Sequence, residues 1–195
     1  MEKYVSFEQG KWNPADFVTA ASVRVDYRLL FGQKADCIHN EGADRMDEYA
    51  YVSMVLRESV DSNCFLSTEC SFNKYGAPLL VLSDELKRLD DGRMQYGHHI
   101  EVVGWENGVN VWDITADPTQ KDGQKVVSLG KFSFPIAGGE RFLLTARYDG
   151  KGLKVGAKAG DRAAEFDCPG KLADRIYVGL TACEGENYFY NFTVK

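Results

Sequence analysis

The 195-residue sequence lacks the long apolar runs of membrane-spanning helices and the closely spaced cysteines of a zinc knuckle. No run reaches the roughly 18 apolar residues that a spanning helix needs, and residues 1–12 contain no apolar signal-peptide core. The cysteines number five, an odd count, and no pair has C-x-x-C spacing, so we expect free, buried thiols. These absences predict a soluble cytoplasmic protein with no membrane partner, no metal site and no other cofactor.

Positive charge is also in deficit. Lys and Arg total 23 against 29 Asp and Glu, which leaves a net charge of −6. An acidic balance argues against nucleic acid or an anionic membrane surface as the main partner. Acidic residues gather in residues 40–48, NEGADRMDE, but EF-hand spacing is absent, so a solvated loop is expected there rather than a calcium site.

The chain shows short segments in which apolar and polar residues alternate, separated by turn-forming residues. This pattern is typical of β-strands, and about a dozen strands suit a sandwich with jelly-roll crossings. No repeat, low-complexity tract or linker divides the chain. The sequence therefore predicts one all-β domain over residues 1–195, a two-sheet antiparallel β-sandwich. The one predicted helix is short and covers residues 84–91, after the capping pair Ser83-Asp84.

Residues 96–114, YGHHIEVVGWENGVNVWDI, form the most informative stretch. Asn107-Gly108 suits the two central positions of a type I′ turn, which would pair Trp105 with Asn110 and Val103 with Trp112. Paired residues point to the same side of a sheet, so the register assigns every side chain to a face. The face predicted to enter the core carries Ile100, Val102, Gly104, Val109 and Val111, with His98 hydrogen-bonded at its edge.

The opposite face mixes aromatic and polar side chains: His99, Glu101, Val103, Trp105, Asn110, Trp112 and Ile114. Sugar-binding surfaces use flat rings to stack on apolar C–H faces and fixed polar groups to bind hydroxyls. We expect this face to line a groove for an oligosaccharide or glycoside, closed in part by Tyr51 and Arg57. The alternative interpretation is that both tryptophans pack under a loop while Glu101 and His99 are solvated at a sheet edge.

Four segments near the C-terminus carry a resemblance to a known superfamily: FPIAGGERF (134–142), TARYDGKGLKV (145–155), IYVGLTA (176–182) and YNFTV (190–194). Together they resemble the concanavalin A-like lectins and glucanases over about a third of the chain. The resemblance implies a curved sandwich that binds or cleaves glycans on its concave sheet. The motifs E-x-D-x-x-E, H-x-N-P-R and Q-I-H are absent, so no catalytic residue is carried over.

Three functions stay open on the sequence. The first and favoured one is carbohydrate binding. The second is glycan processing: a glycosidase needs two carboxylates about 5–10 Å apart, for example Glu101 with Glu69 or Asp26. A polysaccharide lyase instead needs a base and a cation, which Tyr51 or His99 and Arg57 could supply. The third is a sandwich that serves only protein–protein contact.

Overall fold

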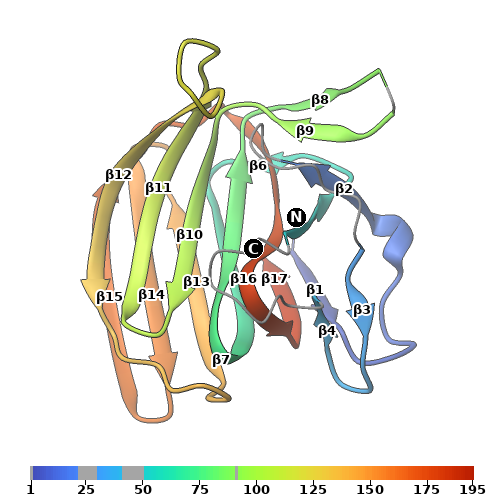
Figure 1. Cartoon of the computed structure of the whole chain (residues 1–195), viewed down its shortest axis with the longest axis vertical. Coiled ribbons are helices and arrows are strands. Elements are labelled where there is room, and N and C mark those ends of the chain that lie inside the picture. Colours follow the sequence, from blue (N-terminus) through green and yellow to red (C-terminus); the bar gives the residue numbers. More distant parts are fainter. Residues whose placement is uncertain (1, 22–29, 41–50, 91) are drawn as a thin grey trace.

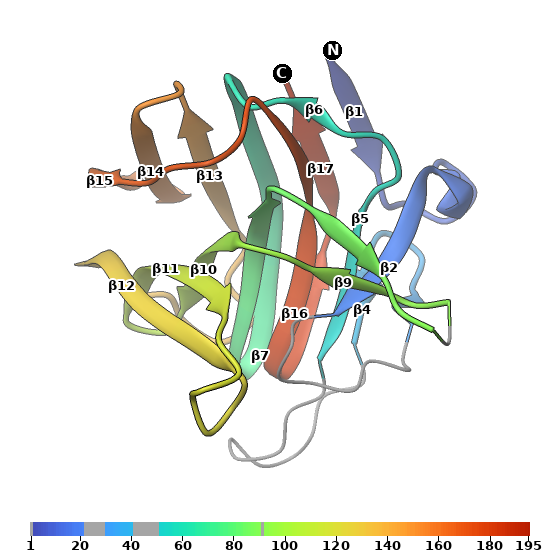
Figure 2. The ribbon, with the colours of Figure 1, turned by 90° about the horizontal axis from the view of Figure 1, so that it is seen from above.

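The computed structural model describes residues 2–21, 30–40, 51–90 and 92–195, and in them two β-sheets pack face to face (Figures 1 and 2). The front sheet contains, in spatial order, β12 (Gln124–Ser133), β11 (Gly108–Ala116), β10 (His99–Trp105), the second half of β7 (Cys64–Ser83), the first half of β16 (Arg175–Phe189), β5 (Val52–Leu56) and β2 (Phe17–Ala21). The back sheet contains β15 (Arg162–Pro169), β14 (Gly152–Ala159), β13 (Phe142–Tyr148), the first half of β7, β17 (Asn191–Val194) and β1 (Lys3–Ser6). All these pairings are antiparallel, which confirms the predicted sandwich.

Short elements complete the fold. They are the 3-10 helix η1 (Pro14–Asp16), β3 (Gly32–Gln33) and β4 (Ile38–His39) beside the end of β16, β6 (Val60–Asp61) beside its start, and the hairpin of β8 (Leu86–Arg88) and β9 (Met94–Tyr96). β9 also pairs in parallel with β2. No helix in the described part of the chain is long and apolar enough to cross a membrane.

The predicted helix over residues 84–91 is wrong, because residues 86–88 form β8 and the other described residues of the segment are not helical. Ser83 and Asp84 were expected to cap the helix, yet their side chains are engaged elsewhere. The Ser83 hydroxyl donates to the carbonyls of Glu85 and His98, and the Asp84 carboxylate accepts from the His98 ring. Tertiary contacts thus override a local capping signal.

β7 and β16 belong to both sheets. The segments 64–72 and 79–82 were expected to be separate strands, but β7 runs through both and pairs with β16 over most of its length. Residues 79–83 of β7 pair with β10 in the front sheet, while residues 64–70 pair with β13 in the back sheet. The two-stranded ribbon therefore turns from one layer into the other.

Asn187 holds this bend in place. β16 bulges at residues 183–187, where Glu184 has a φ of 48° and Gly185 a φ of 65°. The Asn187 amide donates to the carbonyls of Cys183 and Glu184 at 3.1 and 3.0 Å. Opposite, a Cβ at Gly76 would lie 2.4 Å from Asn187 Oδ1. The turn expected at residues 184–186 is therefore a bulge inside a continuous strand.

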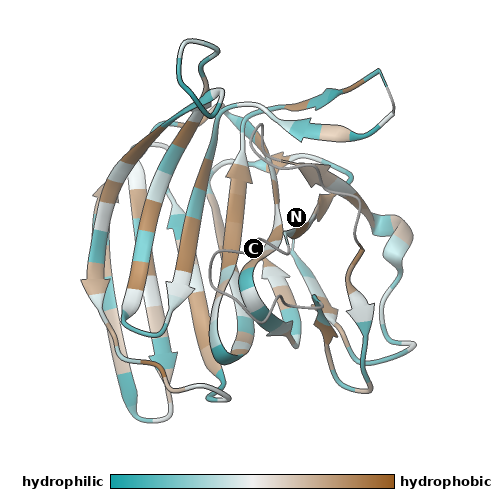
Figure 3. Ribbon diagram, in the orientation of Figure 1, coloured by the Kyte–Doolittle hydropathy of each residue, from teal (hydrophilic) through white to brown (hydrophobic). Residues whose placement is uncertain are grey.

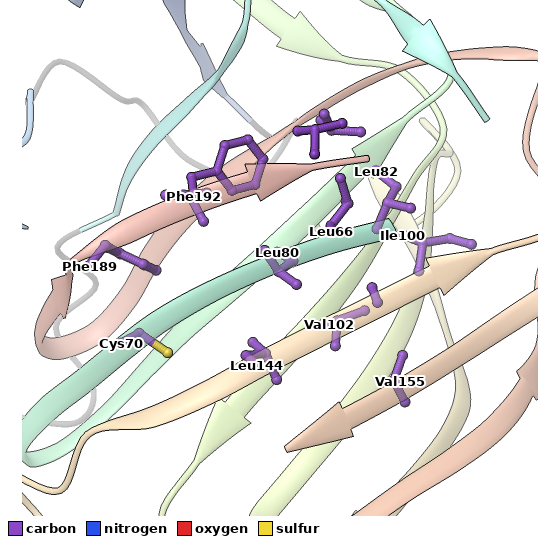
Figure 4. Packing of buried hydrophobic residues seen from close by; sticks show 14 of the residues in the cluster. Leu66, Cys70, Leu80, Leu82, Ile100, Val102, Leu144, Val155, Phe189 and Phe192 are labelled. Atoms are coloured by element: carbon purple, nitrogen blue, oxygen red, sulfur yellow. The ribbon is translucent and has the colours of Figure 1, made fainter. Parts of the chain in front are cut away.

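Hydrophobic and hydrophilic residues alternate along several strands (Figure 3), and successive side chains of a strand point to opposite sides of the sheet. The inward residues form one large apolar cluster between the layers, and Figure 4 shows part of it, including Leu80, Val102 and Leu144. The predicted core faces of the two hairpins are confirmed, since Val102, Val111, Leu144 and Val155 are all fully buried. All five cysteines are free and buried, as expected.

Candidate functional site

The β10–β11 hairpin has a different turn from the predicted one. Trp105 pairs with Gly108, so Glu106 and Asn107 form the loop and Gly108 begins β11. Among the described non-glycine residues only Glu184 has a positive φ, and Asn107 therefore lies outside the conformation that a type I′ turn requires. The prediction that Asn107-Gly108 forms such a turn is wrong.

Gly108 is needed for close approach of the neighbouring strand instead. A Cβ at this position would lie 2.0 Å from the carbonyl oxygen of Phe132. The backbone N–H groups of Phe134 and Ile136 donate to the carbonyls of Asn107 and Glu106. The register consequently differs by two residues from the predicted one, and a shift of two keeps every side chain on its predicted face.

The outward face of β10 and β11 is called the tryptophan face below. It carries His99, Glu101, Val103, Trp105, Asn110, Trp112 and Ile114. In the pairing, Trp112 lies opposite Glu101, Asn110 opposite Val103 and Ile114 opposite His99. Trp105, Asn110 and Trp112 are half-buried. The face thus presents partly exposed rings beside an amide and a carboxylate.

β12 adds two polar residues that the sequence analysis missed. Ser128 lies opposite Trp112, Lys131 lies opposite Asn110, and both are exposed. The register between β11 and β12 shifts at Val111/Trp112, so counting alternate residues along β12 does not assign its faces. Only the strand pairing shows that Ser128 and Lys131 extend the tryptophan face.

His99 and Glu101 form the buried edge of the tryptophan face. His99 is fully buried, and Glu101 is 9% exposed. Nδ1 of His99 donates to the Gly97 carbonyl at 2.9 Å, while Nε2 lies 3.6 Å from Glu101 Oε1. The alternative expectation that these two side chains are solvated at a sheet edge is therefore wrong.

A polar network lies next to this pair. The Tyr96 and His99 ring centroids are 5.0 Å apart, and the Tyr96 hydroxyl lies 2.5 Å from Ser53 Oγ, which in turn is 2.6 Å from Thr181 Oγ1. Burial raises the pKa of Tyr96, so its hydroxyl stays protonated and able to donate. These contacts hold the Tyr96 and His99 rings in place next to Glu101.

The rest of the outward face is covered by apolar side chains. A second cluster joins Leu79 and Val81 of β7 with Val55 of β5 and with Tyr96 of the β8–β9 hairpin. Leu86 and Met94 of the same hairpin pack against it. Among the residues that the structure describes, the exposed part of the outward face is therefore the strip formed by β10, β11 and β12.

The remaining two predicted residues lie away from this strip. β7 and β16 separate β5 from β10 in the sheet. Tyr51 is half-buried against the second apolar cluster. Arg57 follows β5, and its guanidinium donates to the carbonyls of Ala15 and Phe17 at 3.0 and 3.3 Å. The structure brings together five of the predicted residues on one face: His99, Glu101, Trp105, Asn110 and Trp112. It places Arg57 near the edge of the front sheet that is farthest from β12.

No model of a known protein family matches the chain, and no curated protein shows significant sequence similarity to it. Solved structures with a similar fold do exist. The carbohydrate-binding module CBM66 from Bacillus subtilis superposes with a TM-score of 0.60 and 13% identity, covering 92% of this chain and 95% of that one. The exoplasmic/lumenal domain of VIP36 in its Ca2+/Man3GlcNAc-bound form gives 0.61 and 12%, over 97% and 86%.

The lectin UEA-II complexed with galactose gives a TM-score of 0.60 at 8% identity, over 100% of this chain and 98% of that one. The chain has the concanavalin A-like fold. At such identities the likeness concerns the fold alone. The VIP36 structure contains Ca2+, whereas the described residues of this chain include no group of three or more His, Cys, Asp or Glu side chains arranged to hold a metal ion. Residues 41–48 of the acidic segment, like Asp26, lie outside the described residues.

Proposed function

We propose that this protein binds a glycan on the tryptophan face. The observation that carries the proposal is the pairing register, which sets Trp112 opposite Glu101 and places Trp105 and Asn110 on the same side. Half-exposed indole rings offer flat apolar surfaces for the C–H faces of a sugar. The fold supports the same function, because the similar structures include a carbohydrate-binding module and a lectin in complex with galactose.

Glu101 would give the site its selectivity. The carboxylate is almost buried and lies beside the fully buried His99 ring, so its position is fixed before a ligand arrives. A fixed acceptor binds a correctly placed hydroxyl and is left without a partner by the wrong epimer, which costs about 1–3 kcal/mol. The Asn110 amide and the exposed Lys131 and Ser128 would contact further hydroxyls.

The geometry favours binding over cleavage. Of the carboxylates considered as partners for Glu101, Glu69 lies in the back sheet, where its backbone N–H and one carboxylate oxygen bond to Asn191. Arg57 donates to two backbone carbonyls near the far edge of the front sheet. It is therefore not placed to neutralise the acid group of a substrate, as a lyase requires. Neither Glu69 nor Arg57 therefore lies on the tryptophan face, and Asp26 lies outside the described residues.

We also propose that the protein works in a reducing compartment. Support comes from its five buried cysteines, all of which are free thiols. Proteins from oxidising compartments commonly contain disulfides, whereas cytosolic thiols stay reduced.

A thermal-shift screen with neutral oligosaccharides tests the function, because a ligand that binds only the native state raises the melting temperature. With a sugar from this screen, Trp112→Ala and Glu101→Gln should each abolish the shift and leave the unliganded melting temperature within a few degrees. Tyr4→Ala is the matched control, because Tyr4 is an aromatic residue, 66% exposed, on β1 of the back sheet. Normal binding by both site variants would refute the proposal, and release of a shortened sugar would show turnover.

A further inference from the structure

A cleft lies on the side of the front sheet that is opposite the tryptophan face, near the end of β7 and the start of β10, which are at the upper end of Figure 1. Its volume is about 580 Å³, and it is lined by Asp84, His98, Asp113, Thr115, Lys125, Val127, Lys171, Leu172 and Ala173. Asp113 pairs with Ile100, which points into the core, so Asp113 points away from the tryptophan face. The cleft and the tryptophan face are therefore separate surfaces.

The two carboxylates of this cleft already have partners within the protein. Nδ1 of His98 lies 2.5 Å from Asp84 Oδ2, and Nε2 lies 3.1 Å from Asp113 Oδ1. The backbone N–H of Ala173 also donates to Asp84 Oδ1 at 2.7 Å. The His98 ring thus lies between the two carboxylates and contacts one oxygen of each.

The two lysines have no such partner. Lys125 and Lys171 are exposed, and neither forms an ion pair with any described carboxylate. The pKa of Asp117 is lowered chiefly by hydrogen bonds from Thr119, and the charge of Lys125 has a smaller effect in the same direction. The charged side chains of the cleft that have no partner among the described residues are therefore both positive, although the chain carries −6. The cleft is thus complementary to an anion.

The other lining groups suit the rest of a sugar. Asp113 Oδ2 and the Thr115 hydroxyl make no hydrogen bond to the described residues, so both are available to a ligand hydroxyl. Val127 and Leu172 add apolar surface for C–H groups. Clefts of this size accommodate a mono- or oligosaccharide unit.

We propose that this cleft binds an anionic sugar, with the anionic group on Lys125 and Lys171 and hydroxyls on Asp113 and Thr115. The anionic group is a carboxylate, as in a hexuronic acid, or a sulfate ester. His98 acts as a positioning residue, because it holds Asp84 and Asp113 in place. The site goes beyond the proposed glycan binding, since it uses the opposite side of β11 and β12, residues 171–173 after β15 and a charge that the tryptophan face does not need.

Calorimetric titration tests this with four probes: a galacturonic acid trisaccharide, glucose 6-sulfate, a neutral galactose trisaccharide and inorganic sulfate. The double variant Lys125→Gln/Lys171→Gln should weaken binding of the anionic sugar at least tenfold, because two charge-assisted contacts are lost. Lys11→Gln/Lys74→Gln is the charge-matched control, since both lysines are exposed and lie outside the cleft lining. The unliganded melting temperature confirms that both variants fold.

The anionic sugar should bind the parent protein, the control variant and Trp112→Ala alike. Tighter binding of the galacturonic acid trisaccharide would identify the anionic group as a carboxylate, and tighter binding of glucose 6-sulfate would identify it as a sulfate ester. The proposal is overturned if neither anionic sugar binds, if the cleft variant binds normally, or if inorganic sulfate binds as tightly as the sugars. Loss of binding in Trp112→Ala would also overturn it, because the acidic sugar would then occupy the tryptophan face. Failure of the neutral sugar alone would count against the proposed function and not against this cleft.

Discussion

Trp112 lies directly opposite Glu101 in the β10–β11 pairing, so a half-exposed indole ring and a nearly buried carboxylate share one face. The distance between paired positions in an antiparallel sheet is about 4.5–5.5 Å, which is the width of one sugar ring. A pyranose stacked on Trp112 would therefore have its edge within reach of Glu101. This pair therefore offers a ring for stacking and a carboxylate for hydrogen bonds to the same sugar.

The assignment of faces predicts opposite outcomes for two valines. Val102→Asp should lower the free energy of unfolding by more than about 3 kcal/mol, because Val102 is fully buried between the sheets and the new carboxylate has no partner there. Val126→Asp should change it by less than about 0.5 kcal/mol, since Val126 is 44% exposed. Urea unfolding measures both, and equal midpoints for the two variants would show that the faces are wrongly assigned.

The observed hairpin turn makes its own prediction. Gly108→Ala should destabilise the protein by about 1–3 kcal/mol, because the added methyl group would overlap the Phe132 carbonyl. Asn107→Ala should cost less than about 0.5 kcal/mol, since Asn107 is exposed and does not adopt a positive φ. A type I′ turn would give a clear loss for Asn107→Ala, so thermal denaturation of the pair distinguishes the two turns.

Asn187 should contribute measurably to stability through the bend of β16. Asn187→Ala removes the donor to the carbonyls of Cys183 and Glu184, and each hydrogen bond lost costs about 0.5–1.5 kcal/mol. Asn73→Ala is the control, because the one hydrogen bond of the exposed Asn73 side chain to the described residues is a long contact of 3.5 Å to Glu186. If Asn187→Ala lowers the free energy of unfolding by no more than Asn73→Ala does, Asn187 does not stabilise the bend.

Buried thiols make stability fall at alkaline pH. Burial raises the pKa of Cys37, Cys64 and Cys168 from 9.0 to about 11 each. Above pH 9 the unfolded chain releases these protons while the folded chain keeps them, so stability is full below pH 9 and declines as the pH approaches 11. Urea midpoints at pH 7, 9 and 11 measure the decline. The decline should be shallower in Cys168→Ala, and an identical pH dependence would exclude a contribution from this thiol.

The sequence predicted the strands and their faces because alternation is a local property that packing preserves. Val102 and Trp112 were placed on the correct sides even though the turn was wrong, since a shift of two residues keeps the parity. The turn itself could not be predicted, because the requirement for Gly108 comes from β12, whose Phe132 lies 24 residues further along the chain.

The parts of the candidate sites that the sequence did not predict also depend on contacts between strands that are distant in the sequence. Ser128 and Lys131 join the tryptophan face only through a register shift in the β11–β12 pairing. Asp84, His98 and Asp113 meet because the ends of β7, β10 and β11 converge, and no spacing in the sequence marks them as a group. The expectation for His98, a hydrogen-bonded histidine at the core edge, is confirmed, but its two carboxylate partners required the fold.

The ribbon of β7 and β16 also determines how the molecule can open. Each sheet contains a segment of both strands, so separating the layers would break hydrogen bonds in both at once. Subglobal unfolding of one sheet alone is therefore disfavoured, and both sheets should behave as one cooperative unit. The amides of Leu66 and Leu80, which lie in the two halves of β7, should accordingly exchange with solvent deuterium at the same opening free energy.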